Sequence, residues 1–398
     1  MNPAVILSMG ASGLGVARSL ASQGIPIIGM DFDIYAPGFH SRFVDGRQCP
    51  DPVTSPEELL AQLMHLGEEL RDVGVLFPCS DAFLLFVSRN RERLARHFAF
   101  VLPERSVVEG LVYKRYQYEW AERLGVPIPE TFYPRDMSEV VKIESLLRYP
   151  AFIKGHYSHL WARVFGNKGF IVRTPQELEA RFSQVLAAGL EGMVQRIVMP
   201  PGENFAAVGA YISPNGRIQA SVTWQKLRQT PPNFGIGTLL LSKRLPEVEE
   251  TAMRYMRGIG FAGIGVIGFK RDLEDGEWKM IEINGRPWFQ IYFATRCGIN
   301  LPLLYYLDAL KLEPPVMNGF KEGLRFWNPL DDFDSFIRLR RRGRLTLADW
   351  IRSWFIPDVL PYYERGDVRP ALTQANYGLN WMKRFIQTMR DRRDEDAL

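Results

Sequence analysis

The chain has 398 residues, of which 46% are hydrophobic and 24% are charged. This composition is typical of a folded globular protein and excludes disorder along the whole chain. With 49 Lys and Arg against 45 Asp and Glu, the net charge of +4 is too small to indicate nucleic-acid binding. The expected partner is therefore a small molecule and not a nucleic acid.

The cysteines and the N-terminus indicate a cytoplasmic protein. Cys49, Cys79 and Cys297 are far apart and have no metal-ligand spacing, so neither a disulfide framework nor a zinc site is predicted. The first residues lack the cationic segment of a signal peptide. No stretch approaches the ~20 apolar residues that a membrane helix requires, so no transmembrane segment is expected.

The first 105 residues have the pattern of a parallel sheet covered by helices. Short apolar runs at 4–9, 25–30 and 73–78 read as buried strands, and helical patterns at 16–23 and 56–70 lie between them. Strands joined in this way form βαβ units. Residues 1–105 are therefore predicted to form an open, Rossmann-like α/β domain.

The middle of the chain has a different pattern, with one helix followed by many strands. A helix is predicted over 107–124, and β-rich segments follow at 151–154, 169–173, 193–198, 205–212 and 218–224. Turns such as Pro214-Asn215-Gly216 join neighbouring strands, which indicates an α+β region with antiparallel sheet. Residues 314–398 are rich in Trp, Arg and Pro, and helical patterns at 333–342 and 377–393 predict a mostly helical C-terminal extension.

A glycine-rich turn follows the first strand and is open to two interpretations. Gly10, Gly13 and Gly15 stand where glycines let backbone N–H groups approach an anion, and Asp31 ends the second strand. The spacing is GxxGxG instead of the dinucleotide pattern GxGxxG. Two interpretations stay open, a tight turn alone and a turn that contacts a ligand. A nicotinamide cofactor is the less favoured ligand.

Three lysines occur where a nucleotide triphosphate would need them. Lys154 ends an apolar strand, and its ammonium group there can contact phosphate oxygens. A polar loop is expected over 156–166, with Lys168 after it, and Lys114 lies on the preceding helix. Each lysine alone is more often a solvated surface charge, but the order of the three around a loop indicates a phosphate site.

Two further segments contain residues suited to a nucleotide and a metal. Glu282 and Asn284 are two apart in a strand, so they share one face and offer the oxygen ligands that Mg²⁺ prefers. Arg286 extends that face toward phosphates. The strand 193–198 can pair with an adenine edge, and Glu203 after it can accept hydrogen bonds from ribose.

Together these residues resemble the ATP-grasp enzymes, in particular the carboxylate-amine ligases of the D-aspartate ligase type. The resemblance extends from Met1 to about Asp308 and rests on the order of its motifs. In chain order they are Lys114, Gly125-Val126-Pro127-Ile128-Pro129, Lys154, Lys168, 195–198, Gly202-Glu203, 258–270 and Glu282-Ile283-Asn284-Gly285-Arg286. It implies a pre-ATP-grasp domain over 1–105, an ATP-grasp domain of two subdomains that enclose ATP over 106–313, and a C-terminal extension over 314–398.

The resemblance also implies a role for each matching residue. Lys114 and Lys154 would bind the phosphates of ATP, with Lys168 beside them. The other implied positions are Gln195, Arg196, Ile197 and Val198 at the adenine hinge, Glu203 at the ribose, Glu282 and Asn284 at Mg²⁺ or the alternative Mn²⁺, Arg286 at the transferring phosphoryl group, and Lys226 and Arg228 at the acyl-phosphate. One departure is Gly268, which stands where the family usually has a further metal ligand. Asp272 or a water is expected to replace that ligand.

The expected activity is that of an ATP-dependent ligase. A substrate carboxylate attacks the γ-phosphoryl group, and an amine then displaces phosphate from the acyl-phosphate to form an amide. The substrates are expected to be a small carboxylate and an amine, with an amino acid among them. The alternatives are a nicotinamide-dependent oxidoreductase that uses the N-terminal glycines, and a non-catalytic ATP-binding or membrane-associated protein.

The partners of the C-terminal extension stay open. Residues 338–344 are strongly basic and are followed by Trp350 and Trp354. A solvated helix face is favoured for them over contact with anionic lipid or a polyanionic glycan. Because related enzymes are often dimers, a homodimer is a further expectation of the resemblance.

Overall fold

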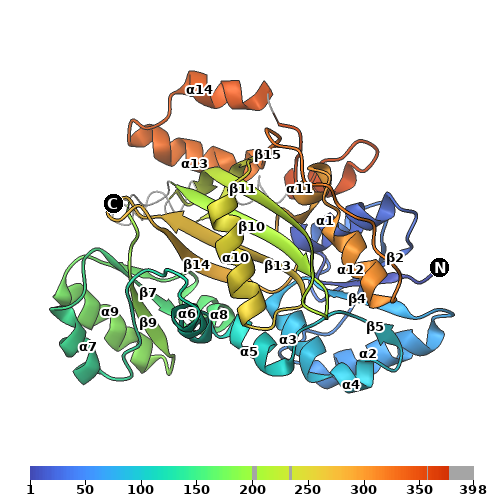
Figure 1. Cartoon of the computed structure of the whole chain (residues 1–398), viewed down its shortest axis with the longest axis horizontal. Coiled ribbons are helices and arrows are strands. Elements are labelled where there is room, and N and C mark those ends of the chain that lie inside the picture. The colour runs from blue at the N-terminus through green and yellow to red at the C-terminus, as the bar shows by residue number, and fades with distance from the viewer. Residues whose placement is uncertain (200–203, 233–234, 356, 376–398) are drawn as a thin grey trace.

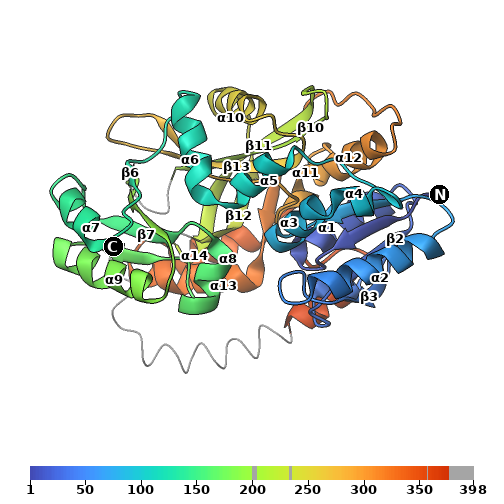
Figure 2. The ribbon, with the colours of Figure 1, turned by 90° about the horizontal axis from the view of Figure 1, so that it is seen from below.

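The computed structural model describes residues 1–199, 204–232, 235–355 and 357–375. A parallel sheet lies near the N-terminus, a small antiparallel sheet lies at the opposite end, and a larger antiparallel sheet lies between them (Figure 1). The view from below (Figure 2) shows the same order along the long axis. Within the described residues, no helix is both long enough and apolar enough to cross a bilayer.

The N-terminal sheet is parallel and has the order β3-β2-β1-β4-β5. Every residue of β1, β2 and β4 is buried, as expected where helices cover both faces. Its elements are β1 Ala4–Leu7, α1 Ala11–Ala21, β2 Ile27–Asp31, η1 Pro37–His40, β3 Asp45–Gln48, α2 Pro56–Glu69, β4 Gly74–Pro78, α3 Asp81–Arg89, α4 Arg91–Leu94 and β5 Phe98–Ala99. The predicted α/β domain is confirmed.

Two glycines near the start of α1, Gly13 and Gly15, serve close packing. A Cβ atom at Gly13 would lie 2.1 Å from the carbonyl oxygen of Ser8, and one at Gly15 would lie 2.6 Å from Ile291. Asp31 is buried, and one of its carboxylate oxygens accepts a hydrogen bond from the Met9 backbone N–H at 2.6 Å. These contacts give the turn and its acidic residue a structural role.

The predicted helix 107–124 is divided in two. α5 is Arg105–Val112 and α6 is Lys114–Arg123, with Tyr113 in an extended conformation between them. The Lys114 backbone N–H donates at 2.9 Å to the carbonyl of His156, outside the helix. The break places Lys114 at the first position of a helix whose N-terminus contacts the end of β7.

The small antiparallel sheet has the order β6-β9-β7-β8 and its own hydrophobic core. Its elements are β6 Thr131–Phe132, α7 Met137–Glu144, β7 Ala151–Gly155, α8 Ser158–Phe165, β8 Phe170–Val172, α9 Pro175–Ala187 and β9 Gly192–Arg196. The prediction of a polar loop over 156–166 is wrong, because α8 occupies it. Trp161 and Phe165, one helical turn apart, pack against Phe170, and Gly166 at φ 66° ends the helix.

The central sheet is antiparallel and has the order β14-β13-β10-β11-β12-β15. Its elements are β10 Phe205–Ile212, β11 Ile218–Thr230, β12 Ile236–Ser242, α10 Pro246–Gly258, β13 Gly263–Arg271, β14 Trp278–Asn284, α11 Ile291–Arg296, α12 Leu301–Ala309 and β15 Arg325–Trp327. Its hydrophobic core is continuous with one face of the N-terminal sheet, since Ile6 and Phe77 belong to the same cluster as Tyr211 and Ile291.

The C-terminal extension packs on the central sheet through β15 and helices. α13 is Pro329–Arg341, α14 is Leu347–Arg352 and η2 is Ser353–Phe355. The predicted helix at 333–342 is confirmed and begins earlier, at Pro329, whereas the one predicted at 377–393 lies outside the described residues. The Asp332 carboxylate is fully buried and accepts hydrogen bonds from Arg228, Thr238, Trp327 and Trp350.

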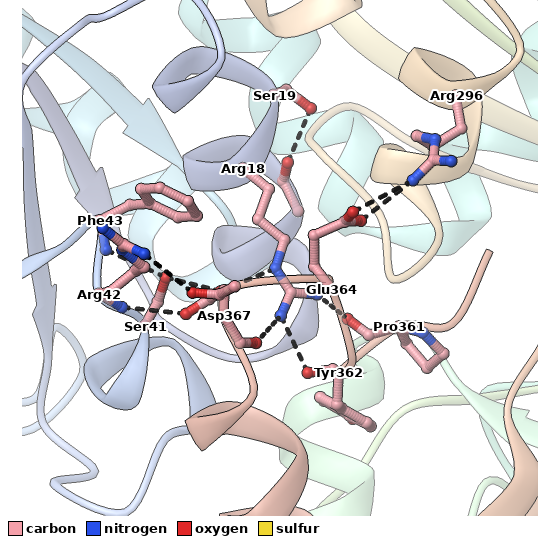
Figure 3. A network of polar contacts seen from close by, with 12 residues as sticks. Arg18, Ser19, Ser41, Arg42, Phe43, Arg296, Pro361, Tyr362, Glu364 and Asp367 are labelled. Carbon is pink, nitrogen blue, oxygen red and sulfur yellow. Dashed lines mark hydrogen bonds and ion pairs between the residues drawn. The ribbon is translucent and has the colours of Figure 1, made fainter.

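A segment after η2 returns to the N-terminal domain and fastens there. The Asp367 carboxylate accepts hydrogen bonds from Arg18 Nε, Ser41 Oγ and the Arg42 backbone N–H, each at 3.0 Å (Figure 3). The side chains of Arg18 and Asp367 are each 1% exposed. We call this buried set of contacts the Arg18–Asp367 clasp.

Candidate active site

A cavity of about 620 Å³ lies between the small sheet and the central sheet, with Asp81 of the N-terminal domain at its edge. This volume is in the range of small-molecule sites. Among the described residues that line it, seven are cationic and two are acidic. The cations are Lys114, Lys154, Lys168, Arg196, Lys226, Lys270 and Arg286, and the acids are Asp81 and Glu282. Such an excess of positive charge in one cavity suits a polyanionic ligand.

Lys154 is held rigidly in the wall of this cavity. β7 carries it, and the side chain is buried in contact with α6 and β9. Its ammonium group donates to Tyr118 Oη at 2.6 Å and to Gln195 Oε1 at 2.9 Å. Burial lowers the pKa of Lys154, and the nearby Lys114 adds to that shift. An anion placed beside it would relieve both effects.

Lys114 and Glu282 form an ion pair across the cavity floor. Lys114 Nζ donates to Glu282 Oε2 at 2.8 Å and links α6 to β14. The attraction of Lys114, followed by that of Lys168 and Lys154, holds the pKa of the Glu282 carboxyl far below its usual range. Glu282 is therefore an anion at every physiological pH.

Two polar residues of β14 face the cavity, as expected from the alternation of side chains along a strand. Glu282 and Asn284 both line it, and Arg286 follows immediately after the strand. Arg286 Nε donates to Asp81 Oδ1 at 2.6 Å. Asp81 begins α3, so this ion pair brings the N-terminal domain to the edge of the site.

The neighbouring strand has no side chain beside Glu282. Gly268 of β13 pairs with Glu282, and a Cβ atom at Gly268 would lie 2.7 Å from the ring of Phe205. The ammonium of Lys226 lies over that ring, 3.6 Å from its centroid, and donates to Gln229 Oε1 at 3.0 Å. Burial, and then the charges of Lys168 and Lys270, lower the pKa of Lys226 to about 7.

The segment predicted as an adenine hinge lies at the end of β9 and lines the cavity. Gln195, Arg196, Ile197 and Val198 all contribute to the wall. The Arg196 side chain turns away to form buried ion pairs with Asp272 and with Glu274, the latter at 3.1 Å. The Arg196 and Ile197 backbone N–H groups donate to the carbonyls of Glu130 and Pro150. The wall is therefore braced before any ligand binds.

The structure places two predicted residues away from the cavity lining. The Arg228 guanidinium donates to both carboxylate oxygens of Asp332, at 2.9 and 2.7 Å, and to Ser353. Asp272 is fully buried between Arg196 and Lys279. Neither residue is brought beside Glu282. Glu203, predicted at the ribose, lies outside the described residues.

The oxygen donors present suit one Mg²⁺ ion that takes most of its ligands from elsewhere. Within the described part of the chain, no cluster of three or more His, Cys, Asp or Glu side chains is placed to hold a metal. Glu282 and Asn284 share one face of β14, and the position next to Glu282 is Gly268. Mg²⁺ commonly combines one or two protein ligands with waters and substrate phosphates, and that pattern fits here.

Sequence reasoning missed the aromatic part of the cavity and its acidic edge. Phe205, Trp224 and Trp288 line the cavity, as does Asp81. Two signals were available for them. Trp224 shares a strand face with Lys226, being two residues away, and Asp81 comes shortly after a parallel strand, where such sheets commonly bind ligands.

Comparisons with known proteins agree with this architecture. The chain is 24% identical over 297 residues to D-aspartate ligase of Enterococcus faecium, a match that covers 71% of this chain and 70% of that protein. No protein-family model matches the chain.

Solved structures share the fold at low sequence identity. A biotin carboxylase complex with β,γ-ATP from Campylobacter jejuni has a TM-score of 0.65 and 17% identity, and the match covers 82% of this chain and 74% of that one. An L-amino acid ligase from Bacillus licheniformis has a TM-score of 0.60 and 15% identity, covering 78% and 74%. The predicted resemblance is confirmed: the chain is similar to D-aspartate ligase and shares the fold of these ATP-grasp ligase structures.

Proposed function

We propose that this protein is an ADP-forming ATP-grasp ligase that joins a carboxylate to an amine. The observation that carries the proposal is the convergence of Lys114, Lys154, Lys168 and Glu282 on one cavity from four separate segments of the chain. The homology with D-aspartate ligase and the fold shared with an L-amino acid ligase support the same chemistry, with an amino acid as one substrate.

The cations of the cavity account for the first half of the reaction. ATP lies against the hinge 195–198, and Lys114 and Lys154 neutralise its phosphates. A substrate carboxylate then attacks the γ-phosphoryl group to give an acyl-phosphate and ADP. Phosphoryl transfer depends mainly on positioning and charge neutralisation. The rigid mounting of Lys154 between Tyr118 and Gln195 provides the positioning.

Glu282 and Asn284 are the residues that would hold a magnesium ion beside these phosphates. When bound, the ion would neutralise phosphate charge and help to orient the phosphates. The Lys114 ammonium donates a hydrogen bond to the Glu282 carboxylate at 2.8 Å and keeps it ionised. Arg286, fixed by Asp81, faces the region where the phosphoryl group is transferred.

The second half of the reaction takes place beside Lys226. An amine attacks the acyl carbon, phosphate leaves with the bonding electrons, and the ammonium proton of the new amide nitrogen passes to solvent or to a basic group. Lys226 lines this part of the cavity on the Phe205 ring. Arg228 acts at a distance, since its guanidinium fastens β11 to Asp332.

The remaining expectations stay predictions. The cysteines Cys49, Cys79 and Cys297 are buried and free, which supports the proposal of a reducing cytoplasm as the location. The homodimer and the contact of residues 338–344 with a membrane are among these predictions. The oxidoreductase alternative is less favoured, since Gly13 and Gly15 are engaged in packing and Asp31 accepts a hydrogen bond from the Met9 backbone N–H.

The test is ATP-dependent formation of a hydroxamate. Hydroxylamine intercepts an acyl-phosphate whatever the natural amine is, so a panel of carboxylates with Mg²⁺ reports the first half-reaction alone. Lys154→Met is expected to abolish hydroxamate formation, and Lys142→Met, an exposed lysine of α7, is the matched control. Full activity of Lys154→Met, or ADP release that does not depend on a carboxylate, would contradict the proposal.

A further inference from the structure

One part of the cavity wall consists of aromatic and aliphatic side chains. Trp224 and Trp288 stack with ring centroids 5.5 Å apart and an interplanar angle of 14°. Phe289, Ile236 and Leu240 complete this wall. We call these five residues the aromatic compartment. It adjoins Lys226, which shares a face of β11 with Trp224, and Arg286, which precedes Trp288 by two residues.

The backbone beneath the compartment makes room for the two indoles. A Cβ atom at Gly209 of β10 would lie 2.3 Å from the Trp288 ring and 3.3 Å from the Trp224 ring. Ala207, two residues earlier on the same strand face, also lines the cavity. Any larger residue at Gly209 would push Trp288 into the cavity. The small residues therefore hold open a space of defined shape against flat aromatic surfaces.

The Trp288 indole is buried together with its N–H group. Trp288 is 5% exposed, and its Nε1 is itself buried and forms no hydrogen bond with any described residue. By contrast, Gln290 in the same segment donates to the Gly237 carbonyl at 3.1 Å. Trp288 therefore contributes to the cavity wall through the apolar part of its ring.

We propose that the carboxylate substrate carries an aromatic or branched apolar group that lies in the aromatic compartment, with its carboxylate directed toward Lys226 and Arg286. The inference rests on the proposed ligase function and specifies its substrate class. The apolar group stacks on Trp224 and Trp288.

The apolar residues of the aromatic compartment disfavour a substrate whose side chain is acidic. Aspartate would bring a second carboxylate against Trp224, Leu240 and Phe289, and an ionised carboxylate loses its hydration there without a paired cation. Lys226 and Arg286 are already assigned to the reacting carboxylate. The chain therefore departs from the substrate printed in the name of its homologue, D-aspartate ligase.

The test compares carboxylates in the hydroxamate assay. The panel contains both enantiomers of phenylalanine, leucine, alanine and aspartate, together with 3-phenylpropionate. We expect the best aromatic or branched carboxylate to exceed alanine and aspartate in kcat/KM by roughly tenfold or more. Hydroxamate formed equally well or better from aspartate or alanine would overturn the inference and leave the ligase function standing. Hydroxamate from no carboxylate would overturn the ligase function itself.

Two variants connect the preference to the compartment. Gly209→Ala forces the Trp288 ring into the cavity and is expected to raise KM for the aromatic substrate roughly tenfold without changing KM for ATP. Trp288→Phe keeps a flat but smaller surface, and is expected to retain the preference for apolar groups while binding more weakly. Phe355→Ala, which alters a side chain 83% exposed on the C-terminal extension, is the control. An unchanged KM for the aromatic carboxylate in Gly209→Ala would contradict the assignment.

Discussion

The cavity and the junction around Asp332 both bury cationic side chains, but they balance charge in opposite ways. At the junction the Arg228 guanidinium donates to both oxygens of the Asp332 carboxylate. Thr238 and two indole N–H groups donate the remaining hydrogen bonds to that carboxylate. Around the cavity, the described lining includes seven cationic and two acidic residues, and of the cations Arg196 turns its side chain away to Asp272 and Glu274. Buried charges are normally paired, so matched cations serve the fold, whereas an excess of cations indicates that part of the neutralising charge arrives with a ligand.

This comparison explains why neighbouring residues of β11 have different roles. Lys226 lies over the Phe205 ring in the cavity, and Arg228 is fastened to the C-terminal extension. In the sequence the two residues look like one basic pair. The acid that separates their roles is more than 100 positions away, on α13.

The most severe loss of activity is expected from Glu282→Gln. This change removes a carboxylate from a site that has few, and takes away the group that the proposal assigns to magnesium. We expect kcat/KM for hydroxamate formation to fall roughly 10²–10³-fold, with a weaker dependence on Mg²⁺ concentration. The measurement is the assay above over a range of Mg²⁺ concentrations. Activity within threefold of the wild type would remove Glu282 from the site.

The most severe loss of stability is expected at the junction, from Asp332→Asn. It leaves the Arg228 guanidinium buried without its carboxylate and is expected to lower the free energy of unfolding by about 3 kcal/mol. Urea unfolding measures this effect. The folded fraction should keep its kcat for hydroxamate formation, and a large decrease in kcat would indicate a direct role of Arg228 at the acyl-phosphate.

A smaller loss of stability is expected from Asp272→Asn. Its carboxylate lies between Arg196 and Lys279, and Arg196 keeps a second partner in Glu274. We expect a decrease of about 2 kcal/mol in the free energy of unfolding, with no change in the Mg²⁺ dependence of activity. A shift in the Mg²⁺ dependence would restore Asp272 to the metal site predicted from the sequence.

The smallest effect is expected in the number of protons taken up when ATP binds. Lys226 has a pKa of about 7 in the ligand-free protein because of burial and neighbouring lysines, so it is mostly neutral at pH 8. A bound polyanion favours the charged form and raises this pKa, so ATP binding at pH 8 is expected to take up as much as one proton. Calorimetry in buffers of different ionisation enthalpy measures the uptake. Lys226→Met should reduce it, and equal uptake in both proteins would assign the proton to another group.

Much of the fold was predictable because its signals are local. Apolar runs, alternation and turn residues identified the parallel domain and most strands of the antiparallel sheets. The errors arose where tertiary contacts decide. The break at Tyr113 depends on a hydrogen bond from Lys114 to His156, and α8 forms because Trp161 and Phe165 pack against Phe170, a contact that the polarity of the segment does not suggest.

The candidate site was predictable to the extent that strand alternation and motif order describe it. Lys154, Glu282 and Asn284 line one cavity, as their positions at strand ends and on one strand face suggested. The aromatic compartment was not predicted, because its residues come from β11, β12 and the segment after β14. No local pattern relates Trp224 to Trp288, which lie 64 positions apart.

The Arg18–Asp367 clasp unites distant parts of the chain behind the site. It ties the C-terminal extension to α1, and the N-terminal and central sheets also share a continuous hydrophobic core. The small sheet has a core of its own and is joined to these parts by polar contacts, among them those of Lys154 with Tyr118 and of Arg196 with Asp272. The cavity therefore lies between two separate cores that polar contacts join.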